Sequence, residues 1–306
     1  MIEILNLSRV PNLKQLIIQH CTRLYKIHAS LGDLKRLIRL DLNGCKCLES
    51  LPHKINLEAL EFFDLRGCSK LKKFPYIVEN MPRLWKLCLS ETIIKDLSLL
   101  VIHLTGLIEL DLRDCRNLLS LPIAICSLMS LKTLNLSGCS KLDKLPENLG
   151  KIEGLENLDL SGTAIKSLPS SVHLKNLKVL SLSGCVGLSS NKLKRFPLMQ
   201  LRRSPDPTGM LERSLIGLCS LAKLDLSYCN VQTIPNVLGC LSSLECLNLK
   251  GNNFVCLPES IIQLSNLTSL FMGGCTHLRM LPKLPLNVKY IDATECTSLE
   301  TLSLRP

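Results

Sequence analysis

The sequence predicts an α/β fold in which a repeated unit stacks into a solenoid, with a parallel β-sheet along its concave face. Two observations lead to this expectation. Hydrophobic residues make up 46% of the 306 residues and aromatic residues only 4%, so the core depends on aliphatic side chains. One leucine pattern also recurs along the whole chain, and such recurrence is the signature of a repeat architecture.

The repeated unit reads L-x-x-L-x-L-x-x-C-x-x-L-x-x-L-P, with clean copies that begin at Leu37, Leu107 and Leu131. The second leucine of the central L-x-L pair advances from Leu42 to Leu182 in six steps over 140 residues, about 23 residues per step. This period lies within the range of leucine-rich repeats and outside those of tetratricopeptide, ankyrin and propeller repeats. We therefore expect one leucine-rich-repeat domain over residues 1–306, curved like a horseshoe and built from about 13–14 repeats.

Each L-x-L pair is expected to form a short strand with both leucines facing the core. One coil cannot bury its leucines alone, so neighbouring coils must stack, and their strands then join into a parallel sheet. After each Leu-Pro the apolar spacing becomes three, as from Pro146 to Leu149 and from Pro258 to Ile261. This spacing predicts 3-10 or short helical turns and loops on the convex face, with proline near the start of each turn.

The register of the repeat varies at several places. Shorter coils omit one residue after the strand, as in the stretches that begin at Thr163, Cys229 and Asn252. Near the N-terminus only 11 residues separate Leu7 from Ile18, which predicts a truncated first repeat.

A longer irregularity covers residues 189–214, a stretch rich in basic residues and proline. There the distance between successive strand leucines, Leu182 and Leu226, is 44 residues, or roughly two periods. We expect a degenerate repeat with a protruding loop, and an excursion loop without any repeat is the alternative. Insertions in solenoids often map to a binding face.

Nine of the sixteen cysteines occupy one column of the repeat. They are Cys21, Cys45, Cys68, Cys115, Cys139, Cys185, Cys229, Cys275 and Cys296. Thr92, Thr163 and Asn252 take the same place, and a thiol, a hydroxyl and an amide can all donate a hydrogen bond to a turn carbonyl. We therefore expect hydrogen bonding from this column, and neither metal binding nor disulfides. Abundant free thiols favour a reducing compartment.

The formal net charge of +11 fits three classes of partner: nucleic acid, an anionic membrane surface or an acidic protein. Basic residues are spread through the repeats and are not interleaved with aromatic residues, as a nucleic-acid groove would require. We therefore expect a solvated basic surface and no nucleic-acid partner. Binding of DNA or RNA that weakens steeply with added salt would favour the nucleic-acid alternative.

No catalytic constellation is visible, so we expect no enzyme activity, no cofactor and no metal. The nearest approach to a phosphate-binding loop is Gly150-Lys151, but Ile152 follows where serine or threonine is required. No window of about 18 apolar residues predicts a membrane span. Met1 leads directly into an apolar strand pattern, so we expect no signal peptide.

Candidate contact residues lie on and beside the predicted strands. The position between the two leucines is mostly acid or amide, basic residues occur in the column after it, and five exposed aromatic residues break the aliphatic pattern. Because aromatic and arginine side chains dominate interface energetics, we predict a protein-binding surface on the concave face and its rim. Its candidate residues are Phe62, Arg66, Trp85, Asp111, Arg113, Tyr228, Lys250, Phe271 and Tyr290. In the alternative interpretation the acids are part of the scaffold and the aromatics cover a neighbouring coil.

The residue before the cysteine column is usually glycine, which suits a turn that leaves a strand. Five residues break this rule at the predicted rim. They are His20, Glu91, Asp114, Tyr228 and Glu295.

Four stretches of the repeat resemble the leucine-rich-repeat region of plant disease-resistance receptors of the TIR-type nucleotide-binding class. They are residues 40–45, 134–142, 161–169 and 290–299. The cysteine column and the short Thr-Ala-Ile coil are the most specific features, and the Gly-x-Ile-Pro signature typical of extracellular plant receptors is absent. The resemblance covers essentially the whole chain.

This resemblance implies an intracellular immune receptor, located in the cytoplasm or, alternatively, the nucleus. It implies that the repeats recognise a pathogen effector or a modified host protein and help to hold a nucleotide-binding domain inactive. Because neither a TIR nor a nucleotide-binding domain lies within these residues, NAD hydrolysis and nucleotide switching do not carry over, and we expect only the sensor part. A free-standing signalling scaffold of the Ras-suppressor-like type is the alternative.

Overall fold

The computed structural model describes residues 2–4, 6–169, 174–185 and 207–300. The chain divides into two compact units, Met1–Asp159 and Leu160–Pro306. Most of the predicted irregular segment, residues 189–206, lies outside the described residues, and the remainder belongs largely to a helix of the second unit.

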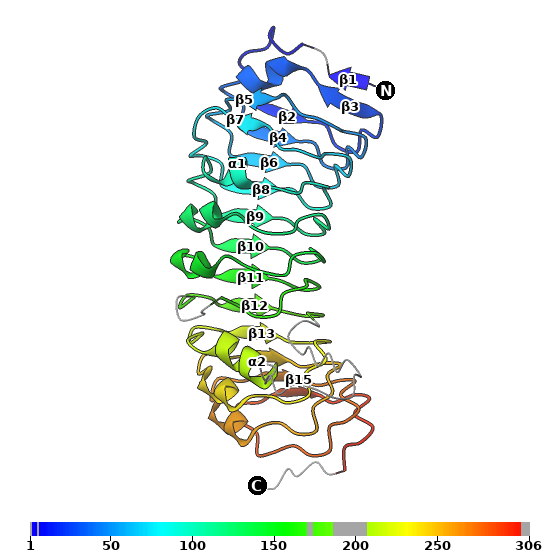
Figure 1. Ribbon diagram of the computed structural model, residues 1–306, viewed down its shortest axis with the longest axis vertical. Coiled ribbons are helices and arrows are strands. Elements are labelled where there is room, and N and C mark those ends of the chain that lie inside the picture. The colour runs from blue at the N-terminus through cyan, green and yellow to red at the C-terminus, as the bar shows by residue number, and fades with distance from the viewer. Residues whose placement is uncertain (1, 5, 170–173, 186–206, 301–306) are drawn as a thin grey trace, which may run out of the picture. The chain divides into compact units, whose positions relative to one another are not determined.

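In the first unit a parallel sheet runs in the order β2, β4, β6, β8, β9, β10, β11 (Figure 1). Each strand is three residues long and contains the first leucine of an L-x-L pair, or Phe63 in its place, as the repeat predicts. The strands are β2 (Gln15–Ile17), β4 (Arg39–Asp41), β6 (Phe62–Asp64), β8 (Lys86–Cys88), β9 (Glu109–Asp111), β10 (Thr133–Asn135) and β11 (Asn157–Asp159).

Two further strand pairs of the first unit lie outside this sheet. Strand β1 (Ile2–Ile4) pairs in parallel with β3 (Leu24–Ile27), and β5 (Lys54–Ile55) pairs with β7 (Tyr76–Ile77). Leu7, the first leucine of the repeat count, lies outside any strand. The unit also contains α1 (Ser98–Val101) and 3-10 helices at Ala29–Asp33, Ile123–Ser127 and Glu147–Lys151.

In the second unit a parallel sheet runs in the order β12 (Val179–Ser181), β13 (Lys223–Asp225), β14 (Cys246–Asn248), β15 (Ser269–Phe271), β16 (Tyr290–Asp292). Strands β12 and β13 pair directly, although about two repeat lengths of sequence separate them. The intervening sequence includes α2 (Pro207–Leu215). Two 3-10 helices follow, at Asn236–Cys240 and Glu259–Gln263.

The predicted 3-10 turns are confirmed, with proline at the N-cap of four of them. These prolines are Pro122, Pro146, Pro235 and Pro258, and their φ angles lie between −73° and −59°. Proline has this φ whatever its context and has no N–H to leave unpaired, so it suits the start of a helical turn. Within the units, the helix Ile123–Ser127 contacts Glu147–Lys151 and the helix Asn236–Cys240 contacts Glu259–Gln263.

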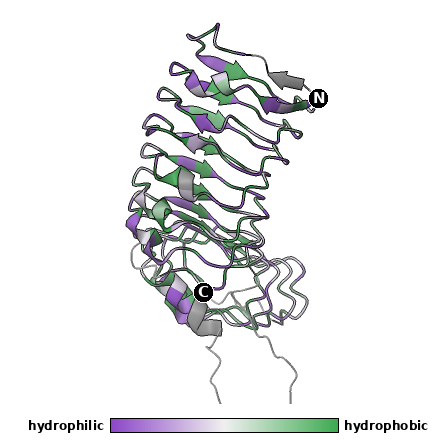
Figure 2. Cartoon of the chain, turned by 45° about the horizontal axis from the view of Figure 1, so that its top comes forward, coloured by the Kyte–Doolittle hydropathy of each residue, from purple (hydrophilic) through white to green (hydrophobic). Residues whose placement is uncertain are grey.

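The core of each unit is the stacked leucine ladder. Leu40 and Leu224 are the central residues of β4 and β13, Leu42 and Leu226 directly follow these strands, and all four are at most 1% exposed. Figure 2 shows the resulting pattern, with hydrophobic and hydrophilic residues side by side within the strands. Each fully buried leucine contributes about 1.5–3 kcal/mol, so the ladder supplies most of the stabilisation. No helix among the described residues is long and apolar enough to cross a membrane.

The cysteine column forms the hydrogen bonds that its substitution pattern predicts. From Cys45 onward, the thiols of the column donate to the main-chain carbonyl that follows the strand of the preceding coil, as from Cys68 Sγ to Leu42 O (3.3 Å) and from Cys139 Sγ to Leu112 O (3.1 Å). Asn252 makes the same bond with its amide, from Nδ2 to Leu226 O at 2.8 Å. The column therefore links successive coils within each unit.

Candidate protein-binding surface

The candidate surface is the open sheet face, which we define as the side of each sheet opposite to the leucine core. Residues i and i+2 of a strand point to the same side, so each short strand offers two side chains to this face. In the first unit the strand register places Arg39 beside Phe62 and Asp41 beside Asp64. The next strands add Lys86 to the first of these columns and continue both toward β9.

The acids of the central column are covered rather than open to a partner. Asp41 is 1% exposed, Asp64 0% and Asp111 7%. Each carboxylate accepts a hydrogen bond from the backbone N–H two residues further on, at 3.3 Å, 2.9 Å and 3.0 Å respectively. These acids therefore fix the turn that leaves the strand, and Asp111, a predicted contact residue, is buried beneath its neighbours.

Arginine side chains cover these acids. Arg66 binds Asp64 through Nη2 at 2.5 Å, Arg113 binds Asp111 at 2.9 Å, and Arg39 binds Asp41 at 2.8 Å. The three arginine side chains remain 39–46% exposed. The open sheet face thus presents guanidinium groups that are held in place by carboxylates lying beneath them.

The pKa values of these groups reflect the pairing. The hydrogen bond to Asp64 raises the pKa of Arg66, and the bond to Asp111 raises the pKa of Arg113. Burial alone would raise the pKa of Asp41, but hydrogen bonds from Arg39 and Gln19 outweigh burial and bring that pKa below its ordinary value. Arg66, Arg113 and Asp41 therefore keep their charges at neutral pH.

An aromatic cluster lies next to Arg39 in the first unit. The guanidinium carbon of Arg39 is 4.5 Å from the centroid of the Phe62 ring, and the Phe62 and Trp85 ring centroids are 6.4 Å apart. Trp85 directly precedes β8 and is 40% exposed. We call Arg39, Phe62 and Trp85 the first aromatic cluster.

The second unit carries a comparable arrangement. Lys250 Nζ lies 5.3 Å from the centroid of the Phe271 ring, and the Phe271 and Tyr290 centroids are 5.2 Å apart. Lys250 also forms an ion pair with Asp292 at 2.7 Å. This bond lowers the pKa of Asp292 to about 2 and raises the pKa of Lys250. We call Lys250, Phe271, Tyr290 and Asp292 the second aromatic cluster.

Tyr228 lies at the rim, in a left-handed backbone conformation with φ of 55°. Its ring covers Gly251 of the next coil so closely that a Cβ on Gly251 would come within 2.3 Å of a ring carbon. The ring is nevertheless exposed, since 62% of Tyr228 is accessible. Tyr228 is therefore a fixed aromatic side chain, and its ring covers the residue that directly follows Lys250 of the second cluster.

The structure thus brings only some of the predicted contact residues together, in one aromatic cluster of each unit. Phe62 and Trp85 contact each other, as do Phe271 and Tyr290, while Arg66 and Arg113 pair with acids of their own coils. Two members of the clusters, Arg39 and Asp292, are missing from the residues selected from sequence. The repeat register carried a signal for Arg39, because it aligns this residue with Phe62 on the neighbouring strand.

Comparison with known proteins shows what this chain is similar to. A family model described as "Disease resistance protein RPS4B-like, leucine-rich repeats" matches residues 56–144 and 141–306. The chain is 38% identical over 294 residues to TMV resistance protein N of Nicotiana glutinosa, covering 92% of this chain and 24% of that protein. It is also 38% identical over 299 residues to disease resistance-like protein DSC1 of Arabidopsis thaliana, covering 98% and 23%.

The chain therefore spans about a quarter of the length of these relatives. Among solved structures, the leucine-rich-repeat domain of the type III effector XopL aligns with a TM-score of 0.54 at 26% identity over 70% of each chain. This likeness agrees with the repeat solenoid that the leucine pattern predicts.

Proposed function

This chain belongs to the leucine-rich repeats of RPS4B-like disease resistance proteins, and we propose from that premise that it is the protein-binding module of an intracellular plant immune receptor. Its open sheet face recognises a pathogen effector or a modified host protein. In the full-length receptor the same module contacts a nucleotide-binding domain and helps to hold it inactive. The chain binds and does not catalyse.

The observation that carries the proposal is the pair of exposed aromatic clusters on the open sheet face. Tyr290 is 52% exposed and Trp85 40%, although large aromatic side chains are usually well buried. Each ring contacts a second ring, so little side-chain entropy remains to be lost when a partner covers it. Rigid, exposed aromatic side chains of this kind are typical anchors of protein interfaces.

The charge of the open sheet face indicates the chemistry of the partner. In the first unit the carboxylates of Asp41, Asp64 and Asp111 are buried while the paired guanidinium groups remain accessible. A partner therefore meets mainly positive charge, in keeping with the net charge of +11. This arrangement favours an acidic patch on the partner, which the basic face would also attract over a distance.

Affinity capture from plant leaf extract, with and without pathogen challenge, tests the proposed surface. One variant combines Phe62→Ala and Trp85→Ala, and a second combines Tyr228→Ala, Phe271→Ala and Tyr290→Ala. Loss of the same captured protein from either variant supports the proposal, and undiminished capture by both variants rejects this surface.

A matched control replaces exposed apolar residues away from the sheet. Ile123→Ala with Met129→Ala removes side chains that are 74% and 63% exposed, at the edge of a 3-10 helix. This control is expected to retain the captured protein. The receptor assignment has its own test, since it requires a phosphate-loop motif encoded in frame upstream of Met1 in the gene. A gene without that motif would favour the free-standing scaffold.

A further inference from the structure

The coil around Thr92 is one residue shorter than the coils on either side of it. One residue lies between Thr92 and the next buried apolar residue, Ile94, whereas two lie between Cys68 and Leu71 and between Cys115 and Leu118. Thr92 occupies the position of the cysteine column in this coil, and its Oγ1 donates a hydrogen bond to Leu89 O at 2.8 Å. A short coil between two longer ones leaves a recess on this side of the first unit.

The recess is a cavity of about 650 Å³. Its apolar wall consists of Phe74 and Pro75 from the preceding coil, Ile93 from the short coil, and Leu100 from α1. Phe74 is held from behind by Phe63, with ring centroids 5.5 Å apart. Small-molecule sites typically enclose about 300–1,000 Å³ and are lined mainly by apolar side chains, so the size and lining match that class.

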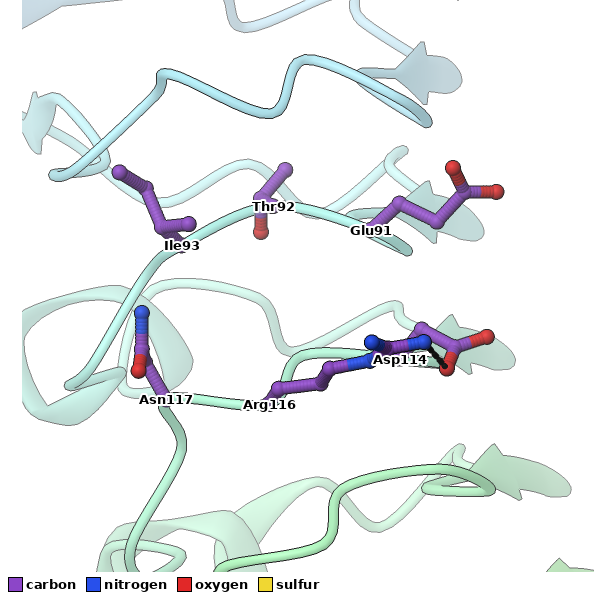
Figure 3. A pocket seen from close by; sticks show the side chains of 6 residues that line it. All are labelled: Glu91, Thr92, Ile93, Asp114, Arg116 and Asn117. Carbon is purple, nitrogen blue, oxygen red and sulfur yellow. Dashed lines mark hydrogen bonds and ion pairs between the residues drawn. The ribbon is translucent and has the colours of Figure 1, made fainter.

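A smaller hollow of about 260 Å³ adjoins the recess and shares Ile93 and Asn117 with it. Figure 3 shows both shared side chains at the same end of this hollow, with Arg116 directed toward Asp114 at the other end. Arg116 Nη2 lies 3.4 Å from Asp114 Oδ1. Arg116 and Asp114 therefore pair with each other, and the third charged residue, Glu91, lies at the end away from the side chains that the hollow shares with the recess (Figure 3).

The rim of the recess carries three lysines and one acid. Lys72, Lys73 and Lys95 are exposed, and none of them forms an ion pair within the described part of the chain. The acid, Asp96, already accepts hydrogen bonds from Ser98, at 2.8 Å from the backbone N–H and 2.5 Å from the hydroxyl. The rim therefore holds an excess of positive charge above an apolar wall.

We propose that this recess binds a small organic anion with an apolar body, of the aromatic or aliphatic carboxylate class. The apolar body packs against Phe74, Pro75 and Ile93, and its carboxylate meets the ammonium groups of the rim. This site is separate from the open sheet face and independent of the proposed receptor function. Volume favours a small molecule over a single docked side chain, because the cavity far exceeds the size of one aromatic ring.

Two probes with the same apolar body test the proposal on the full chain. They are 2-naphthoate, which is anionic, and 2-naphthamide, which is neutral, and binding is measured by titration calorimetry and ligand-observed saturation-transfer NMR. Naphthoate is expected to bind about tenfold more tightly, since several partly exposed ion pairs each contribute up to about 1 kcal/mol. Equal affinity for the two probes overturns the proposal.

Variants of the chain test whether naphthoate binds in the recess. Lys72→Ala, Lys73→Ala and Lys95→Ala together are expected to weaken naphthoate binding about tenfold, and Ile93→Asp to abolish it by placing a charge on the apolar wall. The matched control removes three exposed lysines elsewhere, Lys144→Ala, Lys166→Ala and Lys283→Ala, and should bind like the original chain. Equal loss in both triple variants overturns the proposal.

A peptide is the competing occupant. If naphthoate does not bind at millimolar concentration, while the acidic probe peptide Glu-Phe-Glu-Leu binds and loses affinity in the first triple variant, the recess docks a protein segment and the small-anion proposal is wrong. Circular dichroism melting of every variant establishes that each one is folded. The substituted lysines are exposed, so their melting temperatures should match that of the original chain.

Discussion

Backbone conformation at single residues explains a pattern that the sequence shows only as a break in a glycine column. His20, Glu91, Asp114, Tyr228 and Glu295 all adopt positive φ, between 53° and 61°, as do the glycines that occupy this position in the other coils. Non-glycine residues pay a strain of about 1 kcal/mol or more there. The sequence located the column, but the space for the side chains of His20, Asp114 and Tyr228 comes from a glycine at the same position of the next coil.

Tyr228 and Gly251 show this arrangement, and they support a prediction. Gly251→Ala should destabilise the chain more than Gly274→Ala, because both positions have positive φ but only the Cβ at Gly251 would strike the Tyr228 ring. We expect about 1 kcal/mol of strain at Gly274 and about 2–3 kcal/mol in total at Gly251, measured as the free energy of unfolding in urea.

The double variant Tyr228→Ala with Gly251→Ala distinguishes the backbone strain at position 251 from the steric clash with the Tyr228 ring. Without the ring, the additional cost of the alanine at Gly251 should fall to the value found at Gly274. A cost that stays at its full size in the Tyr228→Ala background would show that ring contact is not its cause.

The buried acids of the open sheet face provide a second prediction at the scale of one residue. Asp64→Ala removes an acceptor for both the Arg66 N–H and its guanidinium, and should lower the free energy of unfolding by about 2 kcal/mol. Asp64→Asn keeps one oxygen for the backbone bond and should cost clearly less. Equal losses in urea unfolding would contradict the structural role of the backbone bond.

These acids mark a limit of prediction from sequence. The repeat gave the correct column and the correct side of the sheet for Asp41, Asp64 and Asp111. Whether an outward-facing carboxylate is accessible depends on where the nearest arginine places its guanidinium, and side-chain packing of that kind is not encoded in spacing. Asp111 was therefore predicted as a contact residue, but its carboxylate lies beneath Arg113.

Among the elements, strands and 3-10 turns were predictable and the smaller strand pairs were not. The L-x-L pairs and the period-three runs after proline are long, repeated signals, and the elements at β9, β10 and Glu147–Lys151 follow them. Strands β5 and β7 have only two residues each, too few for any periodicity. Their pairing depends on how neighbouring coils stack, and the number of residues that follow the L-x-L strand differs between these coils.

The column that links successive coils gives a prediction at the scale of the element. Cys139→Thr keeps a donor, which in Thr92 and Thr163 of the same column bonds a carbonyl of the residue's own coil, whereas Cys139→Val has nearly the same shape and no donor. The free energy of unfolding of the valine variant should therefore be lower than that of the threonine variant by about 1 kcal/mol, the usual net value of one hydrogen bond. The comparison uses thermal and urea unfolding, and equal stability of the two variants would show that the column acts only through its volume.

At the scale of the whole molecule, the same thiols predict sensitivity to alkali. Burial raises the pKa of Cys68, Cys139 and Cys229 to about 12, from about 8.5 for an unfolded thiol. Between these values the folded chain binds more protons than the unfolded chain. The stabilisation is thus complete below about pH 8.5 and is lost as the pH rises toward 12, by up to about 1.4 kcal/mol per thiol and pH unit.

The measurement is the melting temperature from pH 7 to pH 11. We expect a steep decline above pH 9, and a shallower decline in a variant with threonine at Cys68, Cys139 and Cys229, since hydroxyl groups do not ionise in this range. Parallel curves for the two chains would assign the alkaline sensitivity to other groups.

The thiol ladder also bears on how such a gene can change its length. Cys139 donates to Leu112 O, and Cys115 donates in the same way to Leu89 O of its own preceding coil. If recombination removed residues 113–136, Cys139 would meet Leu89 just as Cys115 does now, and the new junction would resemble the present one between these two coils. Unequal crossing-over between copies of the unit therefore yields shorter or longer proteins that still fold, each with a newly arranged set of outward-facing side chains.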